Sequence, residues 1–189
     1  MKNVWRSPVY IRVMILLTVS LFSQENKWNA GESFVTNKNN STGSTTDTPS
    51  YANEKSQVID DIEVRYPRAA KKFALKFPGA TNLRWTKEEN ALFAWFSSKG
   101  HKAYAAFTLQ GKMNYAVTYL EASDLPKNIA RKIANDYGAY TVFNVKQVLI
   151  SGYAVYQIIL ENEQEFIHVQ ATGADIEEID RLIKATGRE

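Results

Sequence analysis

The chain has 189 residues, of which 44% are hydrophobic, 12% aromatic and 23% charged; this composition is typical of a globular protein and excludes a disordered one. Cysteine is absent, which excludes a disulfide framework, a thiolate metal site, a cysteine nucleophile and a lipid-modified cysteine anchor. The formal net charge is +3, and so small a charge gives no general electrostatic reason to bind nucleic acid.

A basic segment followed by an apolar run opens the sequence. Lys2, Arg6 and Arg12 come without any acidic residue, and residues 13–22 are almost entirely apolar. This run is short of the ~20 residues that a helix needs to cross a bilayer. We therefore interpret residues 1–23 as a cleaved secretory signal peptide, with a retained membrane anchor as the alternative. The mature protein, with 20 basic and 20 acidic residues, is then expected in the periplasm, at the cell surface or secreted.

The segment after this leader is polar. Residues 24–55 are rich in Asn, Ser, Thr and Gly and contain few large apolar side chains. Such a segment buries too little apolar surface to offset the loss of chain entropy on folding. The sequence predicts a flexible linker here, followed by one folded domain over residues 56–187.

The first half of that domain begins with a helical pattern. Pro67 suits a first helical turn, Phe73 and Phe77 recur at helical spacing, and Pro78-Gly79 ends the helix. Turn residues then separate four strand-like runs, which cover residues 81–87, 91–98, 102–109 and 112–120.

The second half repeats this order. Pro126 stands near a first helical turn, Ile129 and Ile133 continue the helical spacing, and Gly138 ends the helix. Strand-like runs follow at residues 141–150, 153–161, 165–171 and 174–179. The last run also has apolar residues at helical spacing, but the repeat favours a strand there.

The two similar halves define the expected fold class. Repeat one covers about residues 60–122 and repeat two about residues 123–187, and their shared order of elements indicates an old duplication. Helix-then-strands, repeated, predicts an α+β domain in which about eight antiparallel strands carry the helices on one face.

Several of these residues resemble a known family. The sequence contains Phe77-Pro78-Gly79-Ala80, then Trp85, Phe93-Ala94-Trp95-Phe96 and Tyr104-Ala105-Ala106-Phe107, and Leu125-Pro126 at the start of the second repeat. Over about residues 60–183 it resembles the PepSY-like family of exported bacterial proteins, which is related in fold to the beta-lactamase inhibitor protein. The Asp-Gly turns expected from that family appear as Gln110-Gly111 and Thr172-Gly173. The resemblance implies a non-enzymatic binding or inhibitory module of Bacteroidetes-type bacteria.

Aromatic residues of the strands are the main functional candidates. In strand register one set of faces can carry Trp85, Phe93, Trp95, Tyr104, Tyr115, Tyr119 and Tyr153, while the opposite set carries Ala94, Ala103, Ala105 and Ala116. If the helices cover the alanine side, the aromatic side is an exposed surface that recognises a protein or peptide. The alternative interpretation is that the aromatic side is the core.

Catalytic chemistry has weaker support in the sequence. The two histidines are His101, beside a turn, and His168, inside a strand with Glu161, Glu163 and Glu165 nearby. These residues suggest a hydrolase as one alternative function, and an envelope-associated structural protein is another. We expect no enzyme activity, no metal and no cofactor, because nothing else in the sequence resembles a phosphate loop, a nucleophile elbow or a set of metal ligands.

Overall fold

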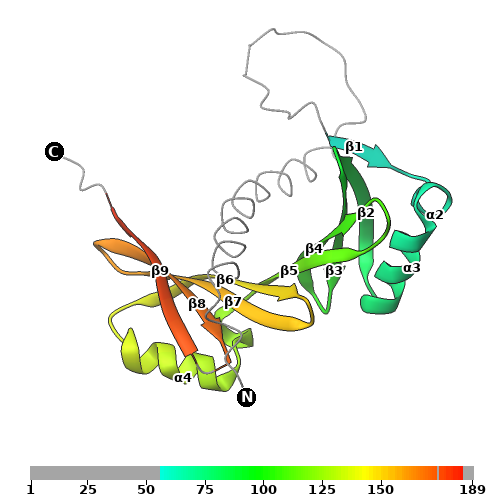
Figure 1. Ribbon diagram of the computed structural model, residues 1–189. Coiled ribbons are helices and arrows are strands. Elements are labelled where there is room, and N and C mark those ends of the chain that lie inside the picture. The colour runs from blue at the N-terminus through cyan, green and yellow to red at the C-terminus, as the bar shows by residue number, and fades with distance from the viewer. Residues whose placement is uncertain (1–55, 174, 185–189) are drawn as a thin grey trace, which may run out of the picture. The chain divides into compact units, whose positions relative to one another are not determined.

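The structure is a computed structural model that describes residues 56–173 and 175–184 (Figure 1). The predicted leader at 1–23 and the predicted linker at 24–55 lie outside these residues. The strands are β1 (Ser56–Ile59), β2 (Thr81–Glu88), β3 (Ala91–Ser98), β4 (His101–Thr108), β5 (Met113–Leu120), β6 (Thr141–Ile150), β7 (Tyr153–Glu161), β8 (Glu165–Thr172) and β9 (Asp175–Ile183). The helices are α2 (Ile62–Arg65), α3 (Pro67–Lys76), α4 (Lys127–Asp136) and the 3₁₀ turn η2 (Ala122–Asp124).

All nine strands form one antiparallel sheet in which the spatial order is the order along the chain, from β1 to β9. The expected fold class is therefore wrong in two respects: the described residues form nine strands rather than about eight, and helices are a minor part of them. β1 is the unexpected strand. It has four residues and pairs with β2 from Ser56 opposite Glu88 to Ile59 opposite Trp85.

The individual elements after Pro67 follow the sequence pattern. α3 starts at Pro67 and ends before Pro78-Gly79, where Gly79 takes a φ of 81° that suits glycine. The predicted strand at 174–179 is confirmed as β9, and it extends to Ile183. Two-residue turns such as Lys99-Gly100, with φ of 52° and 85°, join neighbouring strands and set their register. None of the described helices is both long and apolar enough to cross a membrane.

Two hydrophobic clusters lie on one face of the sheet, which we call the helix face. In the first, Ala69 and Phe73 of α3 pack on strand residues, which are Trp85, Leu92, Ala94, Phe96, Ala103, Ala105, Phe107 and Ala116. In the second, Ile129 and Ile133 of α4 pack on Val145, Ile158, Leu160, Ile167, Val169 and Ala171. The register places both clusters on the same face, because Ala116 pairs with Leu149 and Leu120 pairs with Val145 across β5 and β6.

Candidate binding surface

The opposite side of the sheet carries six of the seven aromatic candidates, and we call it the aromatic face. Strand pairing aligns its side chains in rows that cross the sheet. One row consists of Thr86, Phe93, Ala106, Tyr115, Ile150 and Tyr153. The next consists of Arg84, Trp95, Tyr104, Val117, Val148 and Val155. Tyr119 lies opposite Lys146 on the same face.

The rings of this face pack against one another. Trp95 and Tyr104 have ring centroids 4.9 Å apart, and Phe93 lies 6.4 Å from Trp95. Tyr104 meets Tyr115 edge to face at 6.1 Å, one of the arrangements that aromatic pairs prefer. The indole N–H of Trp95 donates a hydrogen bond to the Thr86 hydroxyl over 3.1 Å. The aromatic side chains of β3, β4 and β5 are therefore held in one arrangement.

Exposure differs sharply among the six residues. Tyr153 is 60% exposed, and Tyr115 and Tyr119 are partly buried. Phe93, Trp95 and Tyr104 are buried, with at most 7% of their surface exposed. The expectation of an exposed aromatic surface is therefore wrong for these three residues, and the accessible aromatic candidates of the face are the tyrosines of β5 and β7.

Trp85 does not belong to this surface. It lies on the helix face, opposite Ala94, and packs against Phe73 of α3 at 5.6 Å and Phe107 at 5.4 Å. The two-residue turn Glu89-Asn90 fixes the register of β2 and β3, so that Thr86 rather than Trp85 faces the same side as Phe93. That turn was visible in the sequence and would have allowed the correct assignment.

The aromatic face also contains polar side chains that the sequence interpretation missed. In the described residues the buried polar or charged side chains are Thr86, Lys146 and Gln157, and all three lie on this face by strand register. The ammonium of Lys146 lies 5.5 Å from the centre of the Tyr119 ring, within the range of a cation–π contact. A buried lysine is rare in an ordinary core, so this face differs in chemistry from the helix face.

His168 stands in β8 on the same face, opposite Asp180 of β9. Its pKa is below the ordinary histidine value, first because burial penalises the charged ring and then because Lys146 repels it, while Asp180 acts in the opposite direction. Glu165 is on the helix face, where Tyr140 and Arg181 donate hydrogen bonds to its carboxylate. Strand alternation thus separates Glu165 from His168.

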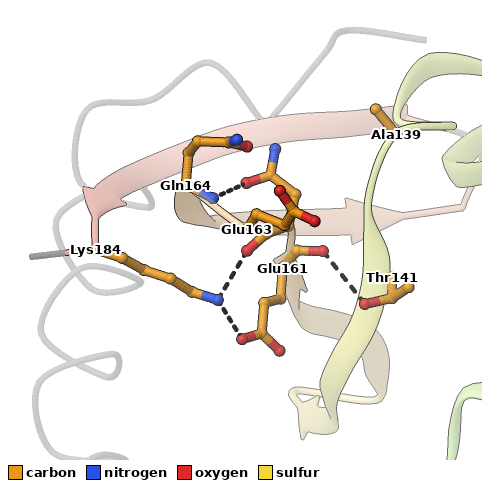
Figure 2. A pocket seen from close by; sticks show the side chains of 7 residues that line it. Ala139, Thr141, Glu161, Glu163, Gln164 and Lys184 are labelled. Atoms are coloured by element: carbon orange, nitrogen blue, oxygen red, sulfur yellow. Dashed lines mark hydrogen bonds and ion pairs between the residues drawn. The ribbon is translucent and has the colours of Figure 1, made fainter. Parts of the chain in front are cut away.

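A shallow pocket of about 550 Å³ lies beside the turn between β7 and β8. Its lining residues are Ala139, Thr141, Glu161, Asn162, Glu163, Gln164 and Lys184. Figure 2 shows the Lys184 ammonium between the Glu161 carboxylate and the backbone carbonyl of Asn162, to which it donates a hydrogen bond over 2.7 Å. The Thr141 hydroxyl donates to the Glu161 carbonyl over 3.2 Å.

These contacts define what the pocket can do. The Lys184 ammonium neutralises Glu161 and also lies 4.5 Å from the centre of the Phe166 ring. Among residues 56–173 and 175–184, no group of three or more His, Asp or Glu side chains is placed to hold a metal ion. We therefore interpret these contacts as structural: they hold the end of β9 against the turn between β7 and β8.

Comparison with solved structures shows that the chain has a BLIP-like fold. A BLIP-like protein from Bacteroides fragilis superposes with a TM-score of 0.53 at 12% identity, covering 65% of this chain and 89% of that one. A DUF2874 family protein from Bacteroides ovatus has a TM-score of 0.50 at 17% identity and covers 59% and 85%. A protein from Bacteroides eggerthii, provisionally described as periplasmic, has a TM-score of 0.50 at 16% identity and covers 61% and 86%.

These likenesses show the fold alone, because every identity is below 25%. No family model matches the sequence, so membership of the PepSY-like family is not shown. No curated protein matches the sequence either.

Proposed function

We propose that the chain is an exported, non-enzymatic binding module that recognises a protein or peptide through the aromatic face. One observation carries the proposal: this face combines packed aromatic rings with the buried side chains of Thr86, Lys146 and Gln157. Lysine is rarely buried in a core, so the burial of Lys146 beside packed rings distinguishes this face from one that serves packing alone.

The buried aromatic residues and the accessible tyrosines have different roles in this proposal. Phe93, Trp95 and Tyr104 hold one another in place, and Tyr104 in turn supports Tyr115. The partner contacts the more accessible Tyr115, Tyr119 and Tyr153. Tyrosine offers a large contact area with few rotatable bonds, and side chains that are already ordered lose little entropy on binding.

The solved structures supply the context of the proposal. The BLIP-like description of the Bacteroides fragilis protein is the reason to include inhibition of the partner among the outcomes of binding. The periplasmic description of the Bacteroides eggerthii protein agrees with export through the leader at residues 1–23. We propose the periplasm or the cell surface of a Bacteroides-like bacterium as the location.

A capture experiment with matched variants tests this function. The chain without residues 1–23 is immobilised and exposed to native envelope extract, and any captured protein is purified and titrated directly. We expect the double variant Tyr115→Ala/Tyr153→Ala to bind at least about tenfold more weakly, or about 1.4 kcal/mol. Leu75→Ala, at a position on α3 that is 70% exposed, is the control and should bind as tightly as the wild type.

Circular dichroism of each variant separates loss of binding from loss of fold. A folded Tyr115→Ala/Tyr153→Ala variant that binds the purified partner with unchanged affinity would show that the aromatic face is not the binding surface.

A further inference from the structure

The two edges of the sheet differ in what they offer to another chain. β1 is an edge of four residues, whereas β9 is an edge of nine, and β8 is its one neighbour in the described sheet. An edge strand presents unpaired backbone N–H and C=O groups, which can pair with a strand of another molecule. β9 is therefore the more extensive site for pairing through the backbone.

The side chains of β9 are also unusually accessible. Every residue from Glu177 to Ile183 is exposed, and Ile179, Leu182 and Ile183 are 38%, 64% and 67% exposed. These three are among nine large apolar side chains that are exposed in the described chain. An exposed edge that carries apolar residues on both sides gains buried area when a second strand covers it.

The charges of β9 are distributed so that the strand complements itself. Its first part carries the acidic residues Asp175, Glu177, Glu178 and Asp180. Its end carries Arg181, and Lys184 is the first residue after the strand. An antiparallel copy of the same strand brings the acidic part of one molecule beside the basic part of the other, so that Arg181, which pairs with Glu165 and Glu178 of its own chain, also meets Glu178 of the second copy. We propose that β9 pairs with β9 of a second copy, around a two-fold axis that passes between residues 179 and 180.

The bulge of β9 allows this register, because it puts the two side chains of each proposed pair on the same face of the sheet. His168 pairs with Asp180 and Val169 with Glu178, so Ile179 is an extra residue. Because of it, Ile176, Glu178, Arg181 and Ile183 all lie on the helix face, opposite Ala171, Val169, Ile167 and Glu165. The proposed register places Ile176 opposite Ile183 of the second copy, and Glu178 opposite Arg181.

The pairs on the aromatic side follow the same register. There Glu177 lies opposite Leu182 of the second copy, and Asp175 lies opposite Lys184, whose ammonium binds Glu161 of its own chain. The two-fold axis repeats every pair, as an isologous interface requires, and opposite charges placed directly across two strands stabilise their pairing. The aromatic faces of the two copies then lie on the same side of one continuous sheet.

Disulfide trapping tests the register, because the sequence has no cysteine of its own. The variant Ile176→Cys/Ile183→Cys of the chain without residues 1–23 is oxidised and separated on a non-reducing gel. We expect a covalent dimer from the double variant and none from either single variant. Within one strand the two positions are seven residues apart, about 23 Å, which is too far for an intramolecular disulfide.

Charge exchange tests the same interface without cysteines. Analytical ultracentrifugation of the unmodified chain should show a monomer–dimer equilibrium, and Arg181→Glu should raise the dimer dissociation constant at least about tenfold. The exchange Glu178→Arg/Arg181→Glu should restore part of the dimerisation, because it rebuilds both intermolecular pairs while the ion pair of Arg181 with Glu165 stays lost. Circular dichroism checks that each variant is folded.

Three results would overturn the proposal. One is a chain that stays monomeric at all concentrations and gives no disulfide-linked dimer. Another is equal trapping of the single and double cysteine variants, since this would indicate random collision. The third is protection of the β9 amides from hydrogen exchange only after envelope extract is added, which would assign the edge to a different partner.

Discussion

Gly111 lies in the turn between β4 and β5, where the chain touches the first turn of α3. Its φ is 83°, and a Cβ atom at this position would lie 2.7 Å from the backbone nitrogen of Ala69 and from the carbonyl carbon of Arg68. Gly173 occupies the corresponding turn of the second half with a φ of 64°, and a Cβ there would meet nothing within 4 Å. In the second half, the turn is joined to α4 by a hydrogen bond from the Asn128 side chain to the Gly173 carbonyl over 2.8 Å.

This pair of glycines gives a matched prediction. Gly111→Ala and Gly173→Ala both place an L side chain at positive φ, at a cost of about 1–2 kcal/mol. Gly111→Ala additionally forces the turn away from α3, and overpacking of this kind costs about 1–3 kcal/mol more. Urea denaturation of the two variants should therefore show that Gly111→Ala lowers the free energy of unfolding clearly more than Gly173→Ala does. Equal losses would mean that the turn moves away from α3 without penalty.

His168 predicts a defined pH dependence of stability. Its pKa is lowered in the folded protein by burial and by Lys146, with Asp180 opposing them, so the unfolded chain binds a proton more readily than the folded one. The stabilisation is fully present above the unfolded pKa of about 6.5 and is lost as the pH falls from there toward the folded pKa.

The measurement compares wild type with His168→Gln. Chemical denaturation is followed between about pH 7.5 and pH 5, which brackets the ordinary histidine pKa. The wild type should lose more stability across this range than the variant, because glutamine does not titrate. Parallel curves for the two proteins would show that another group accounts for the dependence.

At the scale of the elements, Phe73 is the largest side chain of α3 that is buried against the sheet. The Phe73 ring lies 4.9 Å from Phe96 and 5.6 Å from Trp85, and only 4% of Phe73 is exposed. Leu75, two residues on, points away from the core and is 70% exposed. A helix of ten residues is too short to persist by itself, so this docking decides whether α3 forms.

Truncation of these two side chains separates docking from helix propensity. Phe73→Ala should destabilise the protein by about 3–5 kcal/mol, as expected for a buried phenylalanine. Leu75→Ala should change the stability by no more than about 0.5 kcal/mol, since the site is on the surface. Thermal denaturation of both variants compares these changes in stability. A loss of stability for Phe73→Ala as small as that for Leu75→Ala would contradict the assigned role of Phe73.

The sequence predicted most elements because proline and glycine mark their ends. Pro67 and Pro78-Gly79 bracket α3, and glycine-containing turns separate most of the strands. β1 was missed because Ser56–Ile59 is too short to show an alternating pattern.

The exposure of the candidate surface was harder to predict than the elements. Which aromatic side chains are buried depends on the packing of the rings across several strands, as between Trp95 and Tyr104, and no local pattern contains that information. The same holds for Lys146, whose burial depends on the side chains packed around it, among them the ring of Tyr119. Trp85 could have been assigned by counting from the Glu89-Asn90 turn.

At the scale of the whole molecule, two separate hydrophobic clusters share one sheet. α3 covers the first and α4 the second, and the clusters meet where β5 pairs with β6 over six residue pairs, from Tyr115–Ile150 to Leu120–Val145. Since this ladder is continuous, partial unfolding of one half would expose the edge of the other. We expect the halves to unfold as one cooperative unit.

Fluorescence can test this cooperation. With Trp5 and Trp28 replaced by Phe, the emission comes from Trp85 and Trp95, both in the first half. Ile133→Ala removes a buried side chain of α4 in the second half. The variant should shift the fluorescence transition and the circular dichroism transition to the same lower urea concentration. A shift in circular dichroism alone would show that the halves unfold independently.

The sequential strand order also determines how the domain responds to mechanical force. β1 and β9, the first and last strands of the described chain, lie at opposite edges of the sheet. Tension between the two ends therefore acts across the strands and opens the ladder a few hydrogen bonds at a time, beginning with the four residues of β1. Under such tension the sheet would yield first at β1, leaving the pairing of β2 to β9 intact.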